Sequence, residues 1–199
     1  MPLPQSRFAK KTPDPDDRPD KQVVTDSFRW RQEELSGIPY PRLRDTEKVW
    51  QRWRGDRFAP VFKSDFFLDV PPALASMGIA VDVGDGEPPF RFRYFGSALA
   101  QMHTFELTGQ TTDAIEPVGF RTLCISQYQA VLKARHPIVF MNDIPTTNPR
   151  VTAGHVVLRL PFSDDGENVT QVVSVEEIEL DPHEMRQVFS DLIVRVSND

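Results

Sequence analysis

The chain has 199 residues, of which 39% are hydrophobic, and a formal net charge of −6. This length and composition are typical of one globular domain with appendages. The acidic balance disfavours a general nucleic-acid binder, because counterion release needs clustered Lys and Arg. The single cysteine, Cys124, excludes an internal disulfide framework and suits a reducing compartment, so we expect a cytoplasmic protein.

Neither export nor membrane insertion is expected. The opening residues, MPLPQSRFAKK, lack the apolar core of a signal peptide, and no stretch approaches the roughly 20 apolar residues that span a bilayer. Residues 1–24 are rich in proline and charge, which predicts a disordered tail. Residues 25–45, with the break Gly-Ile-Pro-Tyr-Pro at 37–41, are predicted to be a connector.

The first helix is predicted to begin at Asp45 or Thr46 and to end at Gly55. Within it Val49, Trp50 and Trp53 recur at helical spacing, so we expect Trp53 to be buried. Residues 64–76 are predicted to form short helical pieces interrupted by Pro71-Pro72.

A hairpin of two strands is predicted next. Residues 79–83 alternate as a strand does, Gly84-Asp85-Gly86 turns the chain, and residues 90–95 form the second strand. Period-2 alternation predicts that Phe90, Phe92 and Tyr94 share one face.

The middle of the chain is predicted to be helical. Residues 97–116 carry short helical or irregular pieces, and Pro117 suits the first turn of a longer core helix. Its apolar side chains recur with the 3.6-residue period: Phe120, Leu123, Cys124, Tyr128, Val131 and Leu132.

Three further strands are predicted at 136–144, 151–162 and 168–179, the last two joined at Asp164-Asp165-Gly166. In the second of these strands, Val156 and Leu158 lie on one side and His155 lies on the other. We expect the side with His155 to be the exposed outer face of the sheet.

The chain is predicted to end in an amphipathic helix within residues 181–199. Asp181-Pro182-His183-Glu184 is a capping box with proline at the first helical position. The helix carries a long apolar stripe that needs a partner surface in water, either the domain's own sheet or a second copy of the chain.

This order of elements predicts an α+β domain whose antiparallel sheet carries its helices on one face, flanked by N- and C-terminal helices. Hairpin-length links at both ends of the sheet favour antiparallel pairing.

Several short motifs resemble one family, and they occur in its order and spacing. They are Val49, Trp50 and Trp53; Arg91-Phe92-Arg93-Tyr94-Phe95-Gly96; Leu107-Thr108-Gly109-Gln110; the helix with Tyr128; and Leu160-Pro161-Phe162-Ser163-Asp164-Asp165-Gly166. Together they resemble the small PAS-like domains of alphaproteobacteria, a family described as PAS_5 or DUF1457. The resemblance covers roughly residues 46–178, and we expect the PAS-like domain to span residues 46–180.

The resemblance implies a five-stranded antiparallel sheet with helices on one side, and a cytoplasmic role in bacterial signal transduction. Such domains sense small ligands, bind protein partners or form dimers. The resemblance and the facing directions of the side chains place six residues in a ligand pocket: Phe92, Tyr94, Met102, His103, Cys124 and Tyr128. A covalent flavin adduct is not expected, since Cys124 lies mid-helix among apolar neighbours; the cofactor is left open.

No catalytic or metal-binding constellation is evident in the sequence. The four histidines (His103, His136, His155 and His183) show no ligand spacing, and no Gly-x-Ser-x-Gly or phosphate-cradling loop occurs. We therefore expect a non-enzymatic sensory or regulatory module. The alternative is a small enzyme that uses a pocket Tyr or His as acid or base, which requires a titratable group with a partner at the bottom of a roomy cavity.

Overall fold

The computed structural model describes residues 23–25, 28–86, 89–103, 105–145, 152–178, 187, 188 and 190. Most of the predicted tail 1–24 and of the predicted helix 181–199 lies outside these residues. Of the latter, Gln187, Val188 and Ser190 are helical, and Val188 is buried in a core cluster of the domain.

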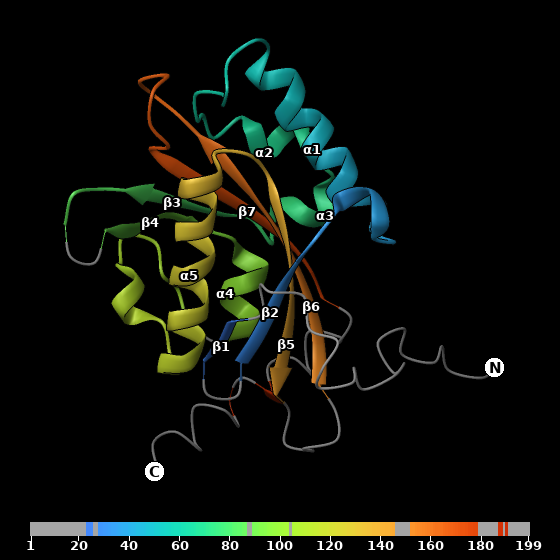
Figure 1. Ribbon diagram of the computed structural model, residues 1–199. Helices are drawn as coiled ribbons and strands as arrows, with labels where there is room; N and C mark the ends of the chain where they lie inside the picture. Colours follow the sequence, from blue (N-terminus) through green and yellow to red (C-terminus); the bar gives the residue numbers. More distant parts are fainter. Residues whose placement is uncertain are drawn as a thin grey trace.

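The described elements form one antiparallel sheet with helices around it (Figure 1). The strands are β1 (Val23–Thr25), β2 (Phe28–Glu33), β3 (Ile79–Val83), β4 (Phe90–Phe95), β5 (Ile138–Pro145), β6 (Thr152–Phe162) and β7 (Gln171–Ile178). The α-helices are α1 (Pro41–Arg54), α2 (Phe66–Asp69), α3 (Pro72–Ala75), α4 (Ser97–His103) and α5 (Val118–Ala134). Two 3-10 turns, η1 (Leu35–Gly37) and η2 (Thr112–Ala114), complete the set.

The predicted α+β class and the antiparallel pairing are confirmed. The strand order across the sheet is β1-β2-β5-β6-β7-β3-β4. The β3-β4 hairpin, the helical middle and the three consecutive strands β5, β6 and β7 occupy the predicted stretches of the chain.

In the described part of the chain the sheet has seven strands, where five were expected. The extra pair comes from the end of the predicted tail and from the predicted connector. β1 includes Val23 and Val24, which were predicted to be disordered and instead pair with β2. β2 pairs with β5 from Arg29 opposite Asp143 to Glu33 opposite Val139. Phe28 and Trp30 alternate inward along β2 and are buried, which explains why this segment joins the sheet. The following helix begins at Pro41 rather than at residue 45 or 46, with proline in its first turn.

Helices cover both faces of the sheet, which corrects the expectation of a single covered face. α4 and α5 pack on one face, hereafter the α5 face, against Phe90, Phe92 and Phe140. α1, α2 and α3 pack on the opposite face, the α1 face, against Leu158, Leu160 and other side chains. A strand covered on both sides, such as β6, is buried along most of its length.

On the α1 face, α1 is held mainly by Trp50, which is 2% exposed and donates its Nε1–H to the carbonyl of Pro161 at 2.7 Å. Trp53, which we expected to be buried, is only partly buried and donates to the Asp69 carboxylate at 2.8 Å. Trp53 packs edge-on against Phe66 of α2, with ring centroids 5.5 Å apart, at the margin of the core cluster.

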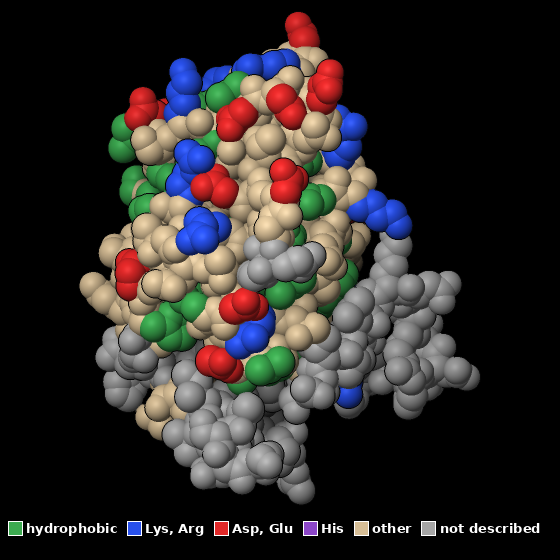
Figure 2. All heavy atoms as spheres, turned by 90° about the vertical axis from the view of Figure 1, so that its left-hand side faces the viewer, with side chains coloured by type: hydrophobic (Ala, Val, Ile, Leu, Met, Phe, Trp, Pro, Cys, Tyr) green, Lys and Arg blue, Asp and Glu red, His purple; other side chains and the backbone are tan. Residues whose placement is uncertain are grey.

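The outer surface carries mixed charge. In the view of Figure 2, Lys and Arg side chains are interspersed with Asp and Glu over the described part of that face. Several are paired, including Arg93 with Asp82 at 2.7 Å and Arg52 with Asp69 at 3.0 Å. Such exposed pairs contribute little to stability and leave no strong field of one sign here.

Candidate functional site

A cavity of about 30 Å³ lies between α5 and the sheet. A space of this size holds about two water molecules. Its lining is Ile79, Phe92, Phe95, His103, Phe105, Leu107, Ile115, Phe120, Leu123, Cys124, Tyr128, Asn142, His155, Arg159 and Glu176. The cavity therefore has an apolar, largely aromatic part and a polar part.

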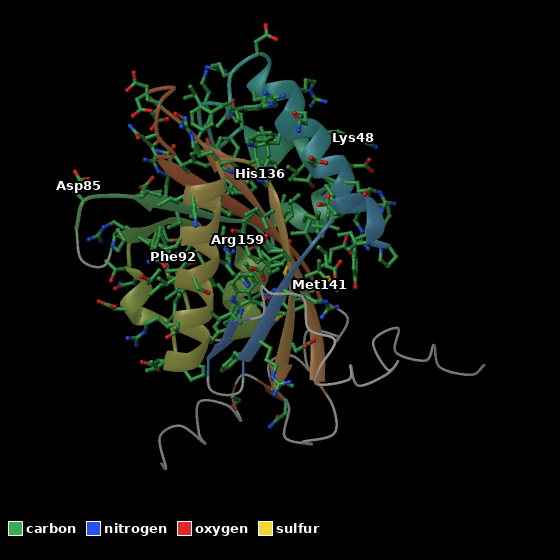
Figure 3. The ribbon with its side chains drawn as sticks, in the orientation of Figure 1. Lys48, Asp85, Phe92, His136, Met141 and Arg159 are labelled. Carbon is green, nitrogen blue, oxygen red and sulfur yellow. The ribbon has the colours of Figure 1, made fainter. Side chains whose placement is uncertain are left out.

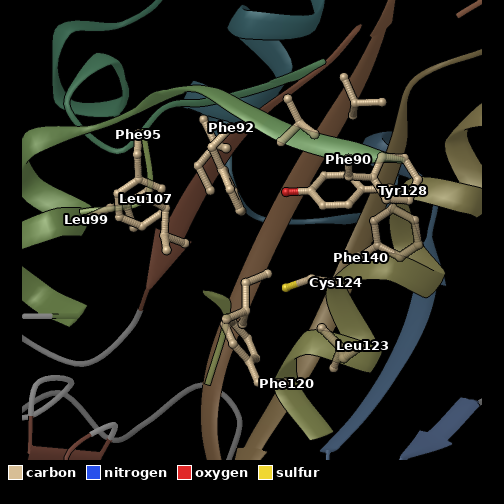
Figure 4. Close-up of a cluster of buried hydrophobic side chains, with 14 of the residues drawn as sticks. Phe90, Phe92, Phe95, Leu99, Leu107, Phe120, Leu123, Cys124, Tyr128 and Phe140 are labelled. Carbon is tan, nitrogen blue, oxygen red and sulfur yellow. The ribbon is translucent and has the colours of Figure 1, made fainter. Parts of the chain in front are cut away.

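The apolar part is built by α5, β4 and the end of α4 (Figure 4). Cys124 and Tyr128 lie one turn apart on the inward stripe of α5, and Tyr128 packs against Phe90 with ring centroids 5.1 Å apart. His103, at the end of α4, is surrounded by aromatic rings, with Phe105 at 5.3 Å and Phe120 at 6.2 Å. These rings close the cavity from the helical side.

The polar part is built by the three central strands and one helix residue. Asn142 of β5 lies opposite His155 of β6, and Arg159 of β6 lies opposite Ser174 of β7. Because side chains alternate along each strand, all of these point to the α5 face. All are at most 5% exposed, and Figure 3 shows Arg159 in the middle of the molecule beside α5.

A continuous chain of hydrogen bonds, the polar chain, crosses this part of the cavity. Arg159 donates through Nε and Nη2 to Oε1 of Gln127 on α5, at 3.0 and 2.8 Å, and through Nη1 to Ser174 at 2.7 Å. Gln127 in turn donates to Oδ1 of Asn142 at 2.6 Å. Asn142 Nδ2 lies 3.4 Å from His155 Nδ1, and His155 Nε2 lies 2.8 Å from Glu176 Oε2.

The direction of these bonds assigns the roles of the two ring nitrogens of His155. Asn142 uses its oxygen to accept from Gln127, so its amide nitrogen faces Nδ1 of His155, which must then accept. Nε2 then donates to the Glu176 carboxylate. Every bond therefore points from the Arg159 cation to the Glu176 anion, an arrangement in which each bond polarises the next.

Both charged ends are held ionised in spite of their burial. Burial by itself would raise the pKa of Glu176, but the attraction and hydrogen bond of His155 and the charge of Arg159 outweigh it and lower that pKa. Burial would likewise lower the pKa of Arg159, and Tyr128, Cys124 and Glu176 reverse this. The Arg159 guanidinium also lies over the Tyr128 ring, 4.2 Å from its centroid.

The reactive side chains of the apolar part are held in unreactive states. Burial lowers the pKa of His103 to about 4, so the ring is neutral at physiological pH. Burial also raises the pKa of the Cys124 thiol to about 11, so the thiolate, which is the nucleophilic form, is not populated. The pKa of Tyr128 is raised by burial as well.

The structure brings four of the six predicted pocket residues to this cavity: Phe92, His103, Cys124 and Tyr128. Met102 is buried but lines a second hollow on the other side of α4. Tyr94 lies on the α1 face, packed against Phe67 at 4.9 Å, with its hydroxyl donating to the Ala75 carbonyl at 3.3 Å.

A β-bulge explains why Tyr94 is misplaced by simple alternation. Ala80 pairs with Tyr94 and Val81 with Phe92, so Arg93 is an extra residue on β4. One extra residue moves every later side chain of the strand to the opposite face. Phe95 therefore lines the cavity, and Tyr94, predicted to share the face of Phe92, lies on the α1 face.

The polar chain was not predicted from the sequence. His155 was expected to be exposed and is 3% exposed, because α5 covers the face that simple amphipathic alternation assigns to solvent. A signal was present: Gln127 lies between Cys124 and Tyr128 on the inward side of a core helix, and a buried amide requires polar partners on the facing sheet.

No family model matches this chain, and no curated protein matches it. Among the described residues, no group of His, Cys, Asp and Glu side chains has an arrangement that could hold a metal ion. Within the same part of the chain, no helix is long and apolar enough to cross a membrane.

Proposed function

We propose that this protein is a non-enzymatic, PAS-like sensory or regulatory module of bacterial signalling, which binds a small ligand in the cavity under α5. The order of elements supports the PAS-like part: the β3-β4 hairpin, the helical middle and the strands β5, β6 and β7 follow one another as the sequence resemblance implies. β1 and β2 extend this unit beyond β5.

The observation that carries the proposal is the cavity with its polar chain. An aromatic lining combined with a few fixed polar groups is typical of small-molecule sites. The enclosed 30 Å³ is about a tenth of the volume at which such sites usually begin, so the ligand that we propose has very few heavy atoms. Arg159 has five N–H groups, of which three are engaged with Gln127 and Ser174. It can therefore donate to an acceptor group on a small ligand in the cavity.

The alternative function, acid-base catalysis by a pocket residue, has one observation in its favour. His155 and Glu176, 2.8 Å apart, resemble a general base oriented by a carboxylate. However, the other ring nitrogen of His155 faces Asn142, so neither nitrogen is directed at a substrate. A base must reach the proton that it abstracts, and binding is therefore the better-supported function.

Native mass spectrometry of the full chain, purified from its own host, tests the proposal. We expect a bound small molecule of discrete mass in the parent protein. Cys124→Met adds two heavy atoms inside the cavity and should release it, whereas Ala80→Val adds two heavy atoms on the α1 face and should retain it. Both variants are checked for folding by thermal melting, because overpacking costs about 1–3 kcal/mol.

A parent protein with the mass of the bare chain, whose melting temperature is not raised by small molecules extracted from the host, would contradict ligand binding. Equal retention by the Cys124→Met variant would place the ligand outside this cavity.

A further inference from the structure

A second hollow, of about 370 Å³, opens where β7 extends past β3. β3 pairs with β7 from Asp82 opposite Gln171 to Ile79 opposite Ser174. Residues 175–178 of β7 therefore lack a strand partner on this side among the described residues. The volume falls in the range of small-molecule pockets, which begins at about 300 Å³.

The hollow lies where β7 has no neighbouring strand on the β3 side among the described residues, so side chains from both faces of the sheet line it. Glu176 belongs to the α5 face and Glu177 to the α1 face, and both line it. α3 and α4 lie beside this end of β7 (Figure 1) and supply an apolar bed that includes Leu74, Met77 and Met102.

Two opposite charges in the hollow approach each other without forming a hydrogen bond. Oε1 of Glu177 is buried and has no hydrogen-bond partner among the described residues. The nearest cationic atom, Nε of Arg42 on α1, lies 3.8 Å away, which is beyond hydrogen-bond distance. Burial raises the pKa of Glu177, and Arg42 opposes this only in part. A buried acceptor in this state requires a donor.

We infer that the hollow binds a free α-amino acid with an apolar side chain. Its ammonium group donates to Oε1 of Glu177, and its carboxylate accepts from the guanidinium of Arg42. Its side chain lies on the bed of Leu74, Met77 and Met102. A zwitterion suits this place because its two charges match a carboxylate and a guanidinium that are adjacent but not bonded to each other.

A lone amine or a lone carboxylate satisfies only one half of the pair. An amine leaves Arg42 without an anionic partner, and a carboxylate leaves Oε1 of Glu177 without a donor while adding a second negative charge beside it. The site thus discriminates by the presence of both groups.

The hollow and the inner cavity share Glu176, whose carboxylate also closes the polar chain at His155. The amino-acid site exists whether or not the inner cavity holds a ligand, so it does not rest on the function proposed above.

Isothermal titration calorimetry of the full chain with L-leucine tests this site. Isopentylamine, which lacks the carboxylate, and 4-methylpentanoate, which lacks the amine, are the matched probes. We expect saturable binding of leucine and at least about tenfold weaker binding of each analogue, since each loses one charge-assisted hydrogen bond.

Glu177→Gln and Arg42→Gln should each weaken leucine binding about tenfold, and Glu167→Gln, at an exposed turn, should leave it unchanged. Ala98→Phe, at a half-buried position that lines the hollow, should abolish binding with the fold retained in thermal melting. Absence of saturable leucine binding would overturn the inference. So would equal affinity for isopentylamine, or unchanged binding in the Ala98→Phe variant.

Discussion

The two faces of β6 contribute to two different interiors. Toward α1, Val156, Leu158 and Leu160 pack with aliphatic and aromatic side chains. Toward α5, His155 and Arg159 belong to a chain of hydrogen bonds that ends in two buried charges. The same backbone therefore supports a dry core on one side and a polar cavity on the other.

The two interiors depend on different physical terms. On the α1 face stability follows the apolar area buried and the volume filled, so a substitution of similar size and polarity costs little. On the α5 face each polar group is satisfied by its neighbours, and loss of one member leaves the others buried without partners. The α5 face should therefore tolerate much less change.

Matched substitutions at adjacent positions of β6 test this difference most strongly. Arg159→Met leaves Gln127 and Ser174 without their donor and Glu176 without its compensating charge, and should cost about 3–5 kcal/mol in the free energy of unfolding. Leu158→Met, on the α1 face, should cost less than about 1.5 kcal/mol. Urea unfolding of both variants measures the two values.

The double variant Arg159→Met with Glu176→Leu sharpens the result. Replacing a buried pair of charges by apolar side chains removes the unpaired charge that the single variant leaves, so part of the lost stability should return. If the single variant unfolds at the urea midpoint of the parent, the polar chain does not stabilise the fold.

The two faces should also differ in how their contribution to stability depends on pH. His103, which lines the cavity on the α5 face, is the titratable group responsible. The pKa of His103 is about 4 in the folded chain, where burial lowers it from its ordinary value of 6.5. Between these pH values the unfolded chain binds a proton that the folded chain excludes, so stability falls as the pH falls. Lowering the pH from 7 to 5 should cost about 2 kcal/mol through this group.

His103→Phe should remove most of this slope. Phe105→Leu is the control, because it changes a neighbouring ring and keeps His103, so its stability should shift without a change of slope. Charges that face His103 across the cavity are those of Glu176 and, when protonated, His155. A slope unchanged in His103→Phe would assign the effect to His155 and Glu176 instead.

Much of the fold could be predicted because its elements carry local signals. The stripe of α5, the turn between β6 and β7 and the alternation of β6 each follow from nearby residues. β2 could not be predicted in this way: Phe28 and Trp30 alternate inward, but the strand exists because β5 offers an edge more than 100 residues later in the chain. The covering of both faces is likewise a property of tertiary packing.

The residues of the candidate site likewise fall into those that local patterns predict and those that depend on tertiary packing. Phe92, Cys124 and Tyr128 are large or apolar side chains on inward stripes, and alternation places them correctly. Tyr94 is misplaced because a bulge has no signature in the strand itself. His155 and Glu176 are missed because polar residues on a strand indicate solvent, unless the helix that covers them is known.

Substitution of the two tryptophans of α1 tests how far the apolar core on the α1 face extends along this helix. Trp50→Ala should cost about 3–5 kcal/mol, the range for a large buried aromatic residue. Trp53→Ala should cost about 1–2 kcal/mol, because a partly buried ring removes less apolar area from water. Equal losses in denaturant unfolding would show that α1 packs on the sheet along its whole length.

The smallest effect is expected at Tyr94, which the bulge assigns to the α1 face. Tyr94→Phe removes one long hydrogen bond to the Ala75 carbonyl and keeps the ring against Phe67, so it should cost about 0.5–1 kcal/mol. Because the hydroxyl does not reach the cavity, the pH slope attributed to His103 should stay the same in this variant. A changed slope, or a loss above about 2 kcal/mol, would place the phenol on the α5 face, among the buried polar groups whose removal is costly.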